Sequence, residues 1–83
     1  MKLNPLIVFR KELDGTALLF NPENGETFGL NQTSAFIWEQ LALKKKKVVI
    51  LKALGEVTEL PPEAERDLAE FLIELKAKGF LEL

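Results

Sequence analysis

The sequence has no cysteine and no histidine among its 83 residues. These absences exclude disulfides, cysteine nucleophiles, histidine general bases and cysteine–histidine metal sites. A glycine-rich phosphate loop and a cluster of metal-binding side chains are also missing, so we expect no cofactor. Ser34 has no histidine partner, and Glu63 and Asp67 fit a solvated helix face better than a carboxylate pair. We therefore predict that the chain is not an enzyme.

Long apolar runs are absent as well. None reaches the roughly 18–20 residues that a membrane-spanning helix requires. Arg10, Lys11 and Glu12 interrupt the N-terminal apolar stretch, which therefore lacks the pattern of a signal peptide. We expect no membrane association and a cytoplasmic location. The length suits one small domain, predicted to span residues 1–83.

The net charge is only −2, but the charges are segregated. Residues 41–55 hold five lysines and no acid, whereas residues 56–83 hold eight acids and three bases. The lysines at 44–47 could contact phosphates, yet the acidic C-terminal part would be repelled by a nucleic acid. We interpret the lysines as a solvated helix start and expect no nucleic-acid ligand.

Three short segments before residue 31 have the composition of β-strands. They are residues 6–10, 17–20 and 26–30, rich in β-branched and aromatic side chains. An Asp-Gly pair and an Asn-Gly pair between them indicate tight turns, since glycine accepts positive φ. The segments therefore predict an antiparallel meander.

Helices are predicted after the meander. Asn31 is expected to cap the first helix, which runs to about Leu43 and buries Trp38. Residues 48–55 are ambiguous, because their β-branched run favours a strand. Gly55, as a helix-ending residue, and the short gap from the first helix favour a helix, which we prefer.

The third helix has the clearest pattern in the sequence. Pro61 and Pro62 are expected to open it and Gly79 to end it. Apolar residues at 68, 71, 72 and 75 follow helical spacing, and Phe80 with Leu81 should fold back on the core. The whole order predicts an α+β winged helix-turn-helix fold, which alone does not define a function.

The third strand is the basis of a candidate peptide groove. An edge strand has unpaired backbone groups with which another extended chain can pair. A neighbouring third helix would supply apolar contacts from Leu68 and Phe71 and charge from Asp67 and Glu70. On pattern alone, the alternative that Phe28, Leu68 and Phe71 are ordinary core residues is favoured.

Several ordered blocks of the sequence resemble the PqqD-like family, the recognition elements of ribosomally synthesised and modified peptides. The blocks are residues 14–20, 24–31, 35–38, 67–75 and 79–81. The hallmarks are a strand that ends in Leu-Asn and a late helix with Asp, Phe-Leu, Leu and a closing glycine. Residues 44–47 depart from the glycine-containing turn and the Ser or Thr of relatives, which puts the start of the second helix in doubt.

The resemblance implies a winged-helix domain that binds the leader segment of a precursor peptide. The leader adds as a strand beside the third strand, against the third helix, and the precursor is presented to modifying enzymes. The implied site residues are Glu26, Thr27, Phe28, Gly29 and Leu30 in the strand, with Ala64, Asp67, Leu68 and Phe71 in the helix.

Among free-standing members, the chain is most similar to the lasso-peptide type. Such a domain would work with a cysteine protease that removes the leader and a cyclase that closes the ring. The alternatives are a peptide chaperone for pyrroloquinoline quinone biosynthesis, a winged-helix DNA-binding regulator and a subunit interaction module. We also expect proline at Phe28 to weaken leader binding more than alanine at Lys45, and a basic leader residue near Asp67.

Overall fold

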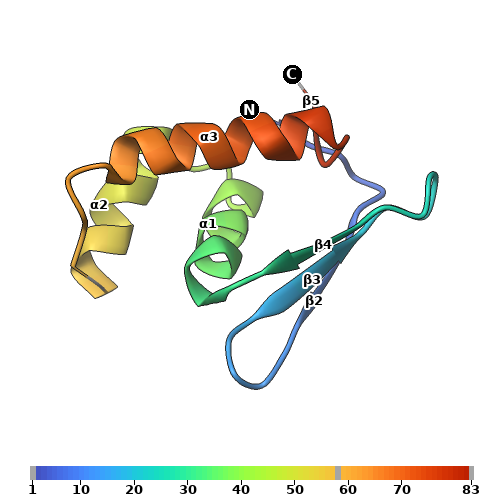
Figure 1. Ribbon diagram of the computed structural model, residues 1–83, viewed down its shortest axis with the longest axis horizontal. Helices are drawn as coiled ribbons and strands as arrows, with labels where there is room; N and C mark the ends of the chain where they lie inside the picture. The colour runs from blue at the N-terminus through green and yellow to red at the C-terminus, as the bar shows by residue number, and fades with distance from the viewer. Residues whose placement is uncertain (1, 58, 83) are drawn as a thin grey trace.

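The computed structural model describes residues 2–57 and 59–82. The elements are β1 (Lys2–Leu3), β2 (Val8–Lys11), β3 (Ala17–Phe20), β4 (Thr27–Leu30), α1 (Gln32–Ala42), α2 (Lys47–Val57), α3 (Ala64–Ala77) and β5 (Leu81–Glu82). Strands β2, β3 and β4 form an antiparallel meander, and β1 pairs with β5. Helix α3 runs above α1, with α2 on one side and the meander on the other (Figure 1). The predicted α+β arrangement, a meander followed by three helices, is confirmed.

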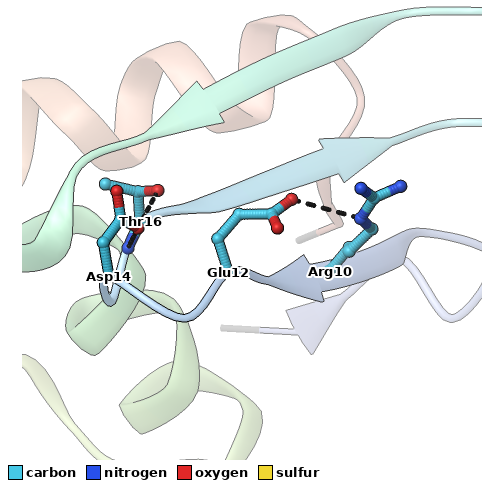
Figure 2. A network of polar contacts seen from close by, with 4 residues as sticks. All are labelled: Arg10, Glu12, Asp14 and Thr16. Carbon is cyan, nitrogen blue, oxygen red and sulfur yellow. Dashed lines mark hydrogen bonds and ion pairs between the residues drawn. The ribbon is translucent and has the colours of Figure 1, made fainter.

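Both predicted turns of the meander are confirmed. Gly15 and Gly25 have φ of +88° and +77°, a region that glycine enters without a steric penalty. In the first turn, Asp14 Oδ1 accepts hydrogen bonds from the Thr16 N–H at 3.0 Å and the Thr16 hydroxyl at 2.6 Å (Figure 2). These contacts hold the β2–β3 turn in a defined shape.

The strands alternate between a core face and an outer face. Leu19 and its β4 partner Phe28 point toward the helices, and Leu19 is fully buried. Leu18 and Phe20 lie on the outer face, where 39% and 37% of their surface is exposed. Trp38 of α1 is buried beneath the core face, as predicted.

The junction between β4 and α1 follows the prediction. Asn31 accepts a hydrogen bond from the Ser34 N–H at 2.8 Å and caps the helix. Leu30 and Ala35, on either side of the cap, are both buried. Because the cap and the apolar pair act together, the strand ends and the helix begins at a fixed residue.

Two helix boundaries differ from the prediction. The preferred helix over residues 48–55 is present as α2, but it continues through Gly55 to Val57. A Cβ atom on Gly55 would lie 3.3 Å from the Leu60 side chain, so this glycine accommodates packing and does not end the helix. Helix α3 begins at Ala64, because Pro61 and Pro62 belong to the preceding turn, in which the Pro61 carbonyl accepts from the Ala64 N–H.

The N-terminal strand begins later than expected. Asn4 forms a turn in which its carbonyl accepts from the Ile7 N–H, so β2 starts at Val8. The Asn4 side chain also donates to the Gly79 carbonyl at 3.0 Å, beside the β1–β5 pair that the sequence did not predict. Phe80 folds back on the core, as predicted, and is fully buried.

Candidate functional site

Strand β4 lies at one edge of the meander, because among the described residues it pairs only with β3. The Asn21 N–H donates to the Glu26 carbonyl at 2.8 Å, and this bond sets the alternation along the strand. Phe28 then pairs with β3, whereas the N–H and C=O groups of Thr27 and Gly29 point away from it. The free edge therefore presents the backbone groups of two residues.

The pairing of β2 with β3 gives the same alternation. The Glu12 N–H donates to the Thr16 carbonyl, so even-numbered residues of β3 face β2 and odd-numbered ones face β4. This geometry corrects the reason for the expected effect of proline at Phe28, and the effect itself stays a prediction. That proline would break a bond between β3 and β4, and would not remove a donor from the free edge. The donors on that edge belong to Thr27 and Gly29.

A cavity of about 310 Å³ opens where β4 leads into α1. Its wall includes all four residues that were predicted on α3, which are Ala64, Asp67, Leu68 and Phe71. The other lining residues are Asn31, Thr33, Ser34, Ile37, Leu54, Glu59, Leu60 and Pro61. Because Asn31 directly follows β4, an extended chain that leaves the free edge would reach this cavity.

Aromatic side chains set the spacing between β4 and α3. The rings of Phe28 and Phe71 meet edge to face, with centroids 6.2 Å apart, and Phe28 meets Phe80 in the same way at 5.9 Å. Lys78 Nζ lies 5.5 Å from the centroid of the Phe28 ring. Phe80 is fully buried and anchors the group, whereas Phe71 is only half-buried and also lines the cavity.

The cavity combines an apolar floor with an acidic rim. Ile37, Leu54 and Leu68 are buried beneath it, whereas Asp67 and Glu59 are exposed at its opening. Apolar walls with a few charged groups are typical of ligand sites. The arrangement is complementary to a ligand that carries apolar and cationic side chains.

The predicted strand residues do not all face the free edge. Thr27 and Gly29 offer backbone groups there. Glu26 uses its carbonyl for Asn21 and its N–H for the Asn24 side chain, within the β3–β4 turn. Leu30 is 3% exposed and belongs to the core. Leu68 on α3 is equally buried, which agrees with the alternative interpretation of that residue as core. The role of each residue in binding stays a prediction.

The sequence did not identify the far wall of the cavity. Ile37 and Leu54 have the spacing of ordinary core positions, and no local pattern distinguishes a core residue that borders a cavity. Leu60 offered a weak signal, because it is a large apolar residue in a polar connection directly before a proline. In the structure it is 36% exposed and packs over Gly55.

Within residues 2–57 and 59–82, no group of acidic side chains is arranged to hold a metal ion. None of the helices there combines the length and apolar character needed to cross a membrane. Each buried polar side-chain atom in the described part of the chain has a hydrogen-bond partner.

Comparison with known proteins defines the class. The family model for coenzyme PQQ synthesis protein D (PqqD) matches residues 16–81, and the chain belongs to this family. The fold is similar to that of TbiB1, solved in complex with the TbiA(beta) leader peptide, at 31% identity and a TM-score of 0.88. That match covers 99% of this chain and 95% of TbiB1.

A second solved structure is similar over the same length. It is lasso peptide synthetase B1 complexed with the leader peptide, at 28% identity and a TM-score of 0.86, covering 99% of this chain and 96% of the other. No curated protein matches the sequence. The predicted resemblance to PqqD-like recognition elements of the lasso-peptide type is thus confirmed.

Proposed function

We propose that this domain binds the leader segment of a ribosomally synthesised precursor peptide as an added strand on the free edge of β4. The observation that carries the proposal is the edge itself. Its free backbone groups at Thr27 and Gly29 lie next to the α3 cavity, in a fold shared with two solved leader-peptide complexes. Main-chain pairing would supply affinity, and alternate side chains would supply specificity.

The side chains of the added strand would alternate between the α3 side and the outer face of the meander. Those on the α3 side would meet the half-buried ring of Phe71 and, beyond Asn31, the apolar floor formed in part by Leu68. Ala64 keeps the start of α3 free of a bulky side chain. Asp67 at the rim would attract a cation on the leader. A leader with apolar residues at alternate positions and a nearby Lys or Arg fits this geometry.

In this proposal the domain binds and presents, and the chemistry belongs to other proteins. Similarity to lasso peptide synthetase B1 supports a lasso-peptide pathway. The partners would then be a leader-cleaving cysteine protease and a ring-closing cyclase. Because an unmodified precursor is made by the ribosome, we place this step in the cytoplasm.

Isothermal titration calorimetry tests the proposal. The titrants are synthetic leader peptides encoded by precursor genes beside the gene for this chain, with the TbiA(beta) leader as a further probe. We expect saturable binding with one peptide per domain. If the folded protein binds none of the leaders from neighbouring genes, the proposal is wrong.

The DNA-binding alternative is tested with the same protein. It predicts retention of a DNA duplex that weakens steeply as the salt concentration rises, because phosphate contacts release counterions. The first turn of α3, which would enter the groove of the duplex, carries Glu65 and Asp67. We therefore expect no duplex binding in a gel shift at low salt.

A further inference from the structure

The outer face of the meander is apolar next to the free edge. Leu18 and Phe20 on β3 are 39% and 37% exposed, and their partners on β4 are Gly29 and Thr27. A Cβ atom on Gly29 would meet no non-neighbouring atom within 4 Å. The surface formed by Leu18, Phe20 and the Gly29 backbone is called here the outer patch. It reaches the free edge at Gly29, where no β4 side chain separates Leu18 from that edge.

The glycine is not required by the backbone at this position. The positive-φ glycines are Gly15, Gly25 and Gly79, and Gly29 is not among them. It also relieves no steric contact, since the space above it is open. A glycine inside a strand weakens the strand and often marks a place where another group approaches closely. What is missing at Gly29 is therefore a side chain on the outer face.

The hydrogen-bond alternation along β4 determines which residue of an added strand would lie beside Gly29 on the outer face. Because the backbone groups of Gly29 face the free edge, a strand added to β4 places one residue level with Gly29. Residues that are level across a sheet share a face, so the side chain of this residue points to the outer face. Its two neighbours point to α3. This holds for a parallel or an antiparallel added strand.

The side chain of that ligand residue can reach the outer patch. Adjacent strands lie about 4.7–4.9 Å apart, so Leu18 is two strand spacings from the added strand. With no side chain on Gly29 between them, a long or aromatic side chain can lean over the glycine and contact Leu18. Cross-strand packing of an aromatic ring over a glycine is a known way to stabilise a sheet edge.

We infer that the outer patch is a second specificity subsite, which takes an aromatic or large aliphatic side chain from the ligand residue level with Gly29. The inference rests on the proposed strand addition and refines its ligand class. The bound segment would be apolar on both faces at this point. Two residues would face α3, and the residue between them would cover Leu18.

A peptide library provides the test. Phage-displayed random peptides of about 12 residues, long enough for one strand and its flanks, are selected on the wild-type protein. Peptides that also bind a Gly29→Pro protein are discarded, because they do not use the free edge. We expect the retained peptides to share a large apolar residue between two positions that face α3.

The subsite is then measured with matched variants. Leu18→Thr should weaken binding of a selected peptide about three- to fivefold, the upper part of the range for one cross-strand pair. Val8→Thr is the control, because Val8 is 52% exposed on the same face but lies on β2, away from the free edge. The affinity of this control protein for the peptide should stay within about twofold of wild type. Gly29→Thr should shift the selected residue toward smaller side chains.

A double-mutant cycle decides the inference. Alanine at the shared peptide residue and Leu18→Thr should be non-additive, because each removes the same contact. Additive effects, or no preference at that peptide position, overturn the subsite and leave leader binding intact. If the wild-type protein selects no peptide that needs the free edge, both the subsite and the proposed strand addition to β4 are wrong. Thermal melts of each variant check that a lost affinity is not lost folding.

Discussion

The two edges of the meander have the same backbone geometry but different side chains. On β2, the Glu12–Thr16 bond leaves the backbone groups of Phe9 and Lys11 facing outward, as Thr27 and Gly29 do on β4. Strand β2 carries Arg10 and Lys11 among its four residues, whereas β4 carries no charge. Charged side chains on an edge strand discourage pairing with another chain. The difference indicates that one edge is protected and the other is left open.

The surroundings of the two edges differ in the same sense. Lys11 on β2 pairs with Glu39 of α1 at 2.9 Å, and the Phe9 ring stacks on Trp38. These contacts attach β2 to the body of the domain. Strand β4 instead leads through Asn31 into the cavity beside α3. An edge strand thus becomes a candidate binding surface through what lies next to it as well as through its free backbone groups.

Proline substitution should change leader affinity the most, and it separates the two edges directly. Gly29→Pro removes an outward N–H from β4, and Lys11→Pro removes one from β2. Proline is tolerated on an edge strand when its N–H faces solvent, so both proteins should fold. We expect Gly29→Pro to weaken leader binding about tenfold or more in calorimetry, because a main-chain bond is lost and the added strand is interrupted.

Lys11→Pro should leave leader affinity within about twofold of wild type, since it loses only an exposed ion pair. Circular dichroism melts of both variants verify folding. Equal affinity losses in the two folded proteins would contradict strand addition to β4.

The next effect concerns the wall of the groove beside β4. Phe71→Ala removes a half-buried ring that packs on Phe28. We expect leader affinity to fall about tenfold and the free energy of unfolding to fall by about 1–3 kcal/mol. The control is Ile73→Ala on the same helix, because 68% of the Ile73 surface is exposed. This substitution should change leader affinity and the free energy of unfolding by little. A destabilised Phe71→Ala protein with full leader affinity would make Phe71 an ordinary core residue.

Much of the fold was predictable because its signals are local. Asn31 needs only the Ser34 N–H to cap α1, and the turn glycines act through their own φ angles. The misassigned positions depend on distant residues. Gly55 stays helical under the Leu60 side chain, and Asn4 binds Gly79 from the other end of the chain. No local pattern contains these partners.

The candidate site divides in a similar way. The resemblance implied the four α3 residues, whose helical spacing places them along one side of the helix, and all four line the cavity. The strand was located, but its free donors were not, because they depend on the register of β4 against β3. A single bond, from the Asn21 N–H to the Glu26 carbonyl, decides that Gly29 and not Phe28 faces outward.

A smaller effect tests the charge at the groove. Asp67→Asn should weaken a leader with a nearby Lys or Arg about two- to threefold at low salt, and the difference should disappear at high salt. Glu65→Gln makes the same change in charge on α3 but lies outside the cavity lining, so it should have less effect. Calorimetry at two salt concentrations measures both. Equal effects of the two substitutions would show that only net charge matters.

The smallest effect is expected on the protected side, at the β2–β3 turn. The Thr16 hydroxyl, and after it the Thr16 N–H, hold the pKa of Asp14 below its usual value of 3.8 (Figure 2). A lowered folded-state pKa stabilises the protein above the unfolded pKa, and this contribution is lost as the pH falls through the folded value.

Thr16→Val removes the larger cause, so the pKa of Asp14 should rise toward 3.8 in a carboxyl NMR titration. Urea unfolding between about pH 2 and 5 should then depend less on pH, while leader affinity at neutral pH stays at the wild-type value. An Asp14 pKa that does not move would show that the hydroxyl is not the cause, and a loss of leader affinity would show that the two edges are not independent.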